Sequence, residues 1–174
     1  MEINKIVTGA LDENCYVISD DKTCLVVDPG DDFENIKEII GDKKVLAVLI
    51  THSHFDHIGA LRNFLKKKSV NIFKKSSLEE KLYEIGNFKF NCIYTPGHSK
   101  DSVTFYFKEI NSMFVGDFIF KETVGRYDLP GGNKSELEES LKKIKDYPED
   151  VKLYPGHGDE TTLKYELENN EYMK

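Results

Sequence analysis

The chain has 174 residues, of which 39% are hydrophobic, and a formal net charge of −7 at pH 7. This length suits a single domain spanning residues 1–174, and the apolar share excludes an intrinsically disordered chain. The acidic balance disfavours nucleic-acid partners, because negative charge repels phosphate backbones. No apolar stretch has the length of a signal-peptide core or a membrane span, so we expect a cytoplasmic protein with no membrane partner.

The three cysteines do not form a pattern typical of a metal or redox site. Cys15, Cys24 and Cys92 lie far apart, and each sits among apolar residues typical of a strand. Because an odd number of scattered cysteines is not a disulfide framework, we expect buried thiols on strands. Such thiols agree with a reducing cytosol.

The N-terminal half alternates short β-type runs with polar or glycine-rich turns. Helical spacing from Phe33 to Ile40, followed by Gly41, predicts a helix with a glycine C-terminal cap. The continuous apolar run Val45–Ile50 favours a strand buried on both faces. The predicted elements are, in chain order, strands at Ile3–Thr8, Asn14–Ser19 and Thr23–Asp28, a helix at Phe33–Ile40, a strand at Val45–Ile50, a loop at Thr51–His57 and a helix from about Ile58 to Lys67.

The C-terminal half repeats this habit. Ser135 is placed to cap a helix, with Glu138 at capping-box spacing. In each half of the chain, strands come first and a mixture of strands and helices follows. Two packed sheets with helices on their outer faces would account for this order. The predicted elements are strands at Asn71–Lys74, Phe88–Tyr94, Val103–Phe107 and Ser112–Val115, a helix at Ser135–Lys145, a strand at Val151–Tyr154 and a helix at Thr162–Asn169.

The segment Thr51–Gly59 carries four side chains of metal-ligand type directly after the predicted buried strand. In an extended segment side chains repeat with a period of two, so we expect His52, His54 and Asp56 to project to one side. His57 then turns in as the next helix begins. A lone histidine is more often a surface or core residue, but four such groups crowded together destabilise a fold unless a cation joins them. Imidazole and carboxylate ligands suit Zn²⁺, Fe²⁺ or Mn²⁺.

The two remaining histidines and one aspartate each follow a predicted strand. His98 and His157 both stand after a Pro-Gly pair, which forces a sharp turn and exposes the imidazole beyond the strand end. Asp117 follows a strand that ends in glycine. A turn aspartate is the alternative for Asp117, but its place beside the other contributing loops favours a ligand.

In this order the HxHxDH motif, His98, Asp117 and His157 resemble the metallo-β-lactamase superfamily, over nearly the whole chain. The resemblance implies an α+β fold, the metallo-β-lactamase-like αββα four-layer sandwich of two mixed β-sheets flanked by helices. It also implies two divalent metal ions, with zinc expected and iron or manganese compatible. The implied ligands are His52, His54 and His98 for one metal and Asp56, His57 and His157 for the other, with Asp117 bridging.

Further segments are similar to the short bacterial and archaeal members of the glyoxalase II-like branch (hydroxyacylglutathione hydrolase-like) of that superfamily. These segments are Thr95–Ser99, Gly116–Asp117, Gly125–Asn133 and Pro155–Gly158. The branch hydrolyses thioesters such as S-D-lactoylglutathione, so the resemblance implies a small-molecule acyl thioester or ester substrate. Few residues follow His157, so we expect no C-terminal helical domain of the glyoxalase II kind, and the thiol carrier stays open.

Arg126 falls where that branch has a basic substrate-binding residue, so it is a candidate to meet a substrate carboxylate. A surface or salt-bridging arginine is the alternative. Two divalent ions lower the pKa of a shared water to about 7, which provides a metal-bridging hydroxide to attack the substrate carbonyl. Asp56, a ligand, is also the group expected to orient this nucleophile. No Gly-x-Ser-x-Gly element is present, so serine nucleophile chemistry has no support.

Two other functions remain open at this point. A persulfide dioxygenase-like oxidoreductase of the same fold would use one iron and would not need Asp56, His57 and His157 as ligands. A metal-stabilised binding protein without activity would usually have a closed, cysteine-rich site of four ligands. The seven nitrogen and oxygen ligands therefore favour the metal-dependent (thio)ester hydrolase.

Overall fold

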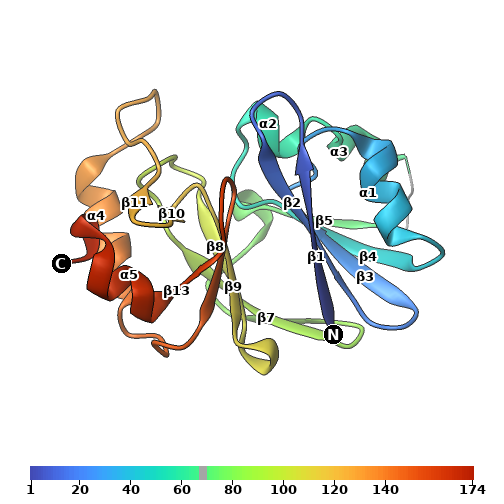
Figure 1. The fold of residues 1–174 in the computed structure, drawn as a ribbon. Coiled ribbons are helices and arrows are strands. Elements are labelled where there is room, and N and C mark those ends of the chain that lie inside the picture. The colour runs from blue at the N-terminus through green and yellow to red at the C-terminus, as the bar shows by residue number, and fades with distance from the viewer. Residues whose placement is uncertain (67–69) are drawn as a thin grey trace.

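Two β-sheets pack face to face in the computed structural model, which describes residues 1–66 and 70–174 (Figure 1). The first sheet has the strand order β1-β2-β3-β4-β5. Its first three strands are antiparallel neighbours, whereas β4 pairs in parallel with both β3 and β5. The bounds are Glu2–Thr8 for β1, Glu13–Ser19 for β2, Thr23–Val27 for β3, Lys44–Leu49 for β4 and Asn71–Phe73 for β5.

The second sheet has the order β13-β12-β9-β8-β7-β6. Strand β8 is antiparallel to both β7 and β9, and β12 is parallel to β9, so β7, β9 and β12 run in one direction. Their C-terminal ends therefore lie at one edge of the sheet. The bounds are Leu82–Ile85 for β6, Phe88–Tyr94 for β7, Val103–Phe107 for β8, Ser112–Gly116 for β9, Lys152–Pro155 for β12 and Thr161–Thr162 for β13, with a separate ribbon of β10 (Ile119–Phe120) and β11 (Thr123–Val124).

Helices cover the outer faces of both sheets. Figure 1 shows α1, α2 and α3 beside the first sheet and α4 and α5 beside the second. None of the helices in the described ranges is long and apolar enough to cross a membrane. The bounds are Phe33–Ile40 for α1, Phe55–Ile58 for α2, Leu61–Leu65 for α3, Lys134–Ile144 for α4 and Leu163–Asn169 for α5, with short 3₁₀ turns at Lys75–Ser77, Lys108–Ile110 and Glu171–Met173.

The core divides into three apolar clusters, as a four-layer sandwich requires. The central cluster joins the inner faces of the sheets, with Ile18 and Leu49 from the first and Phe90 and Phe114 from the second. The outer clusters lie between each sheet and its helices. Alternation along a strand divides its residues between two of these layers. The structure thus confirms the predicted αββα arrangement and places all three cysteines in the core on strands.

Two helix starts differ from the sequence-based expectation. Residues Thr51–His57 are not all loop, because α2 begins at Phe55 and ends at Ile58. Helix α3 follows as a separate short helix, and the predicted end at Lys67 lies outside the described residues. Asp56 therefore reaches the site from the first turn of a helix, and the extended period-two geometry holds only as far as His54, which is still extended.

Helix α4 begins one residue earlier than expected. Asn133 is its N-cap, and the Asn133 side chain accepts a hydrogen bond from the Glu136 amide. Ser135, the predicted cap, lies inside the first turn, so its predicted box with Glu138 does not form the N-terminus. Asparagine competes well with serine at the N-cap. The short strands β6, β10, β11 and β13 were not anticipated, since runs of two to four residues carry little periodicity.

Candidate metal centre

The histidines and aspartates singled out in the sequence meet at one edge of the sandwich. The chain leaves the first sheet at the end of β4, and the next eight residues bring in His52, His54, Asp56 and His57. From the second sheet, the parallel strands β7, β9 and β12 end at the same edge. His98, Asp117 and His157 follow those strands, so sheet direction explains why positions far apart in sequence converge.

One group of ligand atoms, called here the first group, consists of His52, His54 and His98. The Nδ1 atom of His54 lies 3.0 Å from Nε2 of His52 and 3.0 Å from Nε2 of His98. His52 and His98 are buried, and His54 is half-buried. Three ring nitrogens pointing at one spot form the donor set that a divalent transition metal prefers.

A second group, adjacent to the first, consists of Asp56, His57 and His157. The carboxylate oxygen Oδ2 of Asp56 lies 3.2 Å from Nε2 of His157 and 3.7 Å from Nε2 of His57. His57 is fully buried. Two imidazole nitrogens and a carboxylate form a second possible cation site.

Asp117 lies between the two groups. Its Oδ1 is 3.2 Å from Nε2 of His57, and its Oδ2 is 3.5 Å from Nε2 of His98 and 3.6 Å from Nε2 of His157. Three buried side-chain atoms within residues 1–66 and 70–174 have no hydrogen-bond partner, and two of them are His57 Nε2 and Asp117 Oδ1. Buried polar atoms rarely stay unsatisfied. A cation between these two facing atoms would satisfy both, so the residues present fit a metal ion.

The far nitrogens of two imidazoles donate to backbone carbonyls. His98 Nδ1 lies 2.6 Å from the Arg126 carbonyl oxygen, and His157 Nδ1 lies 3.0 Å from the Leu11 carbonyl oxygen. A carbonyl only accepts, so Nδ1 carries the proton in both rings. Each Nε2 then presents its lone pair to the centre, which is the arrangement found behind metal-bound histidines.

Two further imidazoles are held by Asp28 and Thr51. His57 Nδ1 lies 3.0 Å from Asp28 Oδ2. The Thr51 hydroxyl donates to the same oxygen and therefore accepts from Nδ1 of His52 at 3.1 Å. Asp28 also accepts from the Thr51 amide. One buried aspartate at the end of β3 thus fixes the direction of a ligand in each group.

The charges of the centre are strongly coupled in the metal-free state. Burial lowers the pKa of His57, but the carboxylates of Asp117 and Asp28 raise it more, to about 11. Burial raises the pKa of Asp117, but His57 outweighs it and holds that pKa well below its usual range. The pKa of His52 is lowered by burial and then by His57, and the pKa of His98 is lowered by burial. The rings of His52 and His98 are therefore neutral and ready to bind a cation.

Glu13 is a buried carboxyl that sequence reasoning missed. Its Oε1 lies 3.6 Å from Nδ1 of His57 and has no hydrogen-bond partner in the described chain, while its Oε2 accepts from the Thr8 hydroxyl. Burial, followed by the charge of Asp28, raises the pKa of Glu13 to about 9, so the acid keeps its proton at neutral pH. Its position next to Asn14 at a strand start gave no sign of this role.

Asp101 was also missed, and it links two of the loops that carry ligands. Its Oδ2 accepts from the Ser53 amide at 3.1 Å, and its Oδ1 accepts from the Ser99 hydroxyl at 2.8 Å. Ser53 stands between two ligands of the first group, and Ser99 follows the third. A short-range signal existed, because Asp101 stands near His98 among turn residues that bond to backbone.

Glycine is required where the β12 loop passes the centre. A Cβ built on Gly156 would overlap Asp117 Oδ1 and the ring of His57. The amide of Gly156 donates to the carbonyl of Gly116 at 2.9 Å, and the amide of Asn14 donates to the carbonyl of Gly156 at 2.7 Å. The two sheets are thus hydrogen-bonded to each other through this loop, directly beside the ligands.

The ligands lie at the base of a pocket of about 400 Å³. Its lining includes Arg126, the predicted substrate-binding residue, whose guanidinium makes two 2.9 Å hydrogen bonds to the carboxylate of Asp128. A pocket of this kind, with apolar walls and convergent polar groups, is typical of a small-molecule site. Its other lining residues are Leu11, His54, Phe55, Asp56, His98, Asp117, Leu129 and His157.

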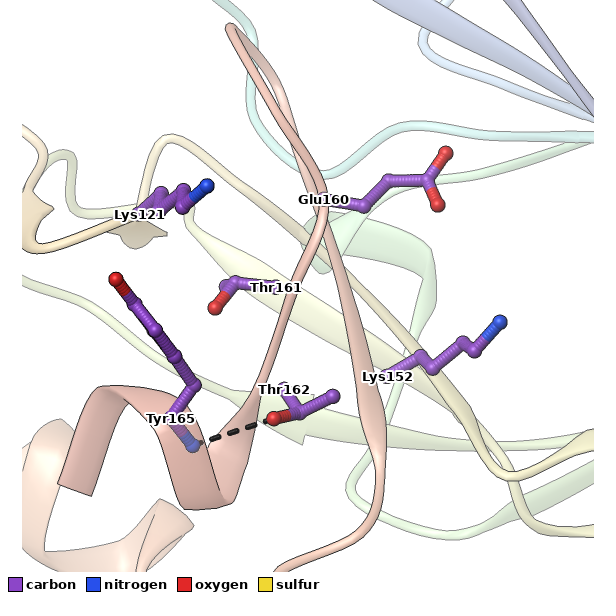
Figure 2. Close-up of a pocket in the computed structure, with 6 residues that line it drawn as sticks. All are labelled: Lys121, Lys152, Glu160, Thr161, Thr162 and Tyr165. Carbon is purple, nitrogen blue, oxygen red and sulfur yellow. Dashed lines mark hydrogen bonds between the residues drawn. The ribbon is translucent and has the colours of Figure 1, made fainter. Parts of the chain in front are cut away.

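A second pocket, between β13 and α5, lacks this chemistry (Figure 2). The Thr162 hydroxyl already accepts from the Tyr165 amide at 3.2 Å, and the Thr161 hydroxyl donates to buried Glu166 at 2.6 Å. Figure 2 shows the side chains of Lys152 and Glu160 pointing away from Tyr165. Because its hydroxyls are occupied within the protein, this pocket is not the candidate site.

The sequence pattern of the metallo-beta-lactamase superfamily matches residues 8–91 and 78–157 of this chain. The chain belongs to this superfamily. The probable metallo-hydrolase YqgX of Bacillus subtilis is 32% identical, with 99% of this chain and 98% of the relative covered. The hydroxyacylglutathione hydrolase GloC of Haemophilus influenzae is 26% identical over 99% of this chain and 98% of its own. At the level of the family, the chain is a metal-dependent hydrolase.

Solved structures agree with this family membership. The crystal structure of BLEG-1, a B3 metallo-beta-lactamase, matches with a TM-score of 0.94 and 30% identity over 99% of this chain and 100% of that one. TTHA1623, crystallised in a di-iron-bound form, matches with a TM-score of 0.87 and 30% identity over 97% and 99% of the two chains. ETHE1 from Myxococcus xanthus has a TM-score of 0.90 at 23% identity, over 98% and 84%, and so shares the fold.

Proposed function

We propose that this metallo-β-lactamase superfamily chain hydrolyses an acyl thioester or ester with two divalent metal ions. In the reaction, water adds to the carbonyl carbon, the bond to sulfur or oxygen breaks, and the products are a carboxylate and a thiol or alcohol. Zinc is the expected metal, and iron and manganese are compatible with the same ligands. The supporting observation is that seven side chains of ligand type converge and that five of them line an open pocket large enough for a substrate.

Each ligand has a part in this proposal. His52, His54 and His98 hold one ion, and the second group of Asp56, His57 and His157 holds the other. Asp117 would bridge them, because its carboxylate lies close to His98 of the first group and to His57 and His157 of the second. Bound there, the two ions supply a hydroxide at neutral pH and positive charge for the carbonyl oxygen.

The remaining work belongs to side chains of the protein. Asp56 lines the pocket with its Oδ2 3.2 Å from Nε2 of His157, where it would orient the attacking hydroxide. Arg126 lines the same pocket, within reach of a bound substrate, with its guanidinium paired to Asp128. The buried carboxyl groups of Asp28 and Glu13 hold the His57 ring from behind. The relatives named hydroxyacylglutathione hydrolase and the di-iron-bound TTHA1623 support the reaction class and the two-metal centre.

The second group also argues against the one-iron dioxygenase. That chemistry would not need Asp56, His57 and His157 as ligands, yet their ligand atoms all lie within 4.8 Å of one another, as do those of the first group. A non-enzymatic metal-stabilised protein would need no pocket above its ligands. ETHE1 is only 23% identical to this chain, so its similarity supports a shared fold and not a shared activity.

The test pairs metal analysis with hydrolysis. Protein purified without added metal is assayed for metal per chain and for turnover of acyl thioesters, S-D-lactoylglutathione among them. We expect about two ions per chain and turnover that falls at least 1,000-fold in Asp117→Ala and His54→Ala. One iron per chain, no hydrolysis of any thioester or ester, and oxygen uptake with a persulfide would overturn the proposal.

A further inference from the structure

The mouth of the metal-centre pocket carries three large apolar side chains that face solvent. Leu11 is 52% exposed, Phe55 is 75% exposed and Leu129 is 37% exposed, and all three line the pocket. They come from the β1–β2 turn, the start of α2 and the segment after β11. Three separate loops thus bring apolar surface to one opening, and exposed apolar surface gathered in this way typically marks a binding site. We call these three residues the apolar rim.

The rim is built into the same segments that fix the ligands. The Leu11 carbonyl accepts from His157, and Phe55 stands between His54 and Asp56 in the chain. Leu129 follows Arg126 by three residues, and the Arg126 carbonyl accepts from a first-group ligand. A molecule whose reacting carbonyl reaches the ligands therefore has its adjoining atoms against the rim.

The charge around the pocket points the same way. Among the described lining residues other than the histidines, Arg126 is the one cation, and two nitrogens of its guanidinium, Nε and Nη2, donate to the Asp128 carboxylate. The two side chains are 68% and 63% exposed, so the pair sits in solvent at the opening as a neutral unit. A thiol carrier rich in carboxylates, such as glutathione, finds no unpaired side-chain cation there.

We propose that the apolar rim binds an uncharged, apolar acyl group of several carbons, and that the pocket prefers such (thio)esters to S-D-lactoylglutathione. This inference rests on the proposed function. The acyl chain adjoins the reacting carbon, so it lies within reach of the rim when that carbon is at the ligands. Asp128 contributes to the preference by keeping Arg126 from free anions.

The experiment compares uncharged acetyl, butyryl and hexanoyl thioesters of N-acetylcysteamine with S-D-lactoylglutathione, on metal-loaded protein. We expect kcat/KM to rise at least tenfold from acetyl to hexanoyl, since a few methylenes in an apolar pocket discriminate by about that factor or more. We also expect hexanoyl to exceed S-D-lactoylglutathione at least tenfold. A flat chain-length profile, or S-D-lactoylglutathione as the best substrate, overturns the inference and leaves the proposed function standing.

Three variants locate the preference on the rim. Phe55→Ser and Leu11→Ser each lower the hexanoyl-to-acetyl ratio about fivefold. The matched control is Leu82→Ser on β6, because Leu82 is 51% exposed and does not line the pocket, and it keeps the ratio. Unfolding midpoints are measured beside the kinetics, so that a folding defect is seen as such. Unchanged ratios in both rim variants with normal midpoints overturn the assignment.

The last variant releases Arg126. Asp128→Asn leaves the guanidinium unpaired, and we expect it to raise kcat/KM for S-D-lactoylglutathione about threefold to tenfold without raising the hexanoyl-to-acetyl ratio. No gain for the anionic substrate overturns the part assigned to Asp128. Absence of hydrolysis for every thioester tested is a different result, because it removes the proposed function itself.

Discussion

The two ligand groups consist of the same kinds of residue and lie side by side, yet the protein holds them differently. In the first group, His98 donates to a backbone carbonyl and His52 donates to a hydroxyl. In the second group, His57 donates to the Asp28 carboxylate, with Glu13 next to it. In the first group both of these partners are neutral, whereas in the second group a carboxylate stands behind His57 and a backbone carbonyl behind His157.

This difference shows how a protein prepares neighbouring positions for unlike tasks. A carboxylate behind an imidazole makes the ring more basic and a stronger ligand. It also stabilises the proton on the ring when no cation is bound, as the raised pKa of His57 shows. His52 and His98 of the first group bind a cation as neutral rings, whereas His57 of the second exchanges a proton for a cation.

The largest predicted effect is a difference in pH dependence. With a pKa of about 11 in the metal-free protein, His57 carries a proton throughout pH 7 to 9. A cation at Nε2 must displace that proton, so affinity in the second group rises with pH, about tenfold per unit and a hundredfold over this range. The first group changes less, because the pKa values of His52 and His98 are lowered. Chelator competition at pH 7, 8 and 9 measures the metal affinity of both groups. An equal rise of affinity with pH in the two groups would contradict the comparison.

The next effect concerns Asp28. In Asp28→Asn, an amide replaces the oxygen that accepts from His57, and we expect metal affinity in the second group to fall about 10-fold to 100-fold. Metal titration of the purified variant gives the number. Asp31→Asn, an exposed aspartate of the same loop, is the control. If metal affinity fell only in the first group, the role of Asp28 in supporting the second group would be wrong.

Asp101 provides the corresponding test for the first group. Asp101→Ala removes the acceptor shared by the Ser53 amide and the Ser99 hydroxyl, so the two loops lose their common anchor. We expect roughly tenfold weaker metal binding in the first group, at the lower end for such supporting partners. Asp101→Asn keeps an acceptor and should restore most of the affinity. A general folding defect would lower both groups alike, and the conservative variant would not rescue it.

The smallest effect is expected at Glu13. Since the acid keeps its proton at neutral pH, Glu13→Gln replaces one neutral group with another of the same shape, and we expect unfolding free energy at pH 7 to change by less than about 1 kcal/mol. Glu13→Ala removes the bond from Thr8 and leaves a cavity, at a cost of about 2 kcal/mol or more. Urea unfolding of both variants measures this difference. Equal losses of unfolding free energy in the two variants would mean that the ionised carboxylate is needed.

Much of the fold was predictable because its strands are strongly patterned. The predicted strand Val45–Ile50 differs from β4 by one residue at each end, and the predicted strand Phe88–Tyr94 coincides with β7. The convergence of the candidate ligands was predictable because metal chemistry restricts residue type and because the loops that carry them follow strands. The helical turn at Phe55 was not, since a four-residue helix leaves no periodic signal in the sequence.

The supporting residues were hidden for a different reason. Asp28 stood as the last residue of the predicted strand Thr23–Asp28, and Glu13 as a polar residue just before the predicted strand Asn14–Ser19. Their roles arise only when the sheets bring β2, β3 and α2 together, which is a tertiary event that local sequence does not encode. The pairing of Arg126 with Asp128 is local, but an arginine two residues from an aspartate is too common to indicate it.

Each ligand group draws residues from both sheets, with His98 or His157 supplied by the second sheet and the others by the first. A bound ion would therefore link the two sheets, and its binding free energy would add to the free energy of unfolding of the folded chain. Without bound metal, the protein would unfold more often at the contact between the two sheets and would then be exposed to proteases. The supply of metal in its surroundings then sets how long each molecule survives as well as how fast it works.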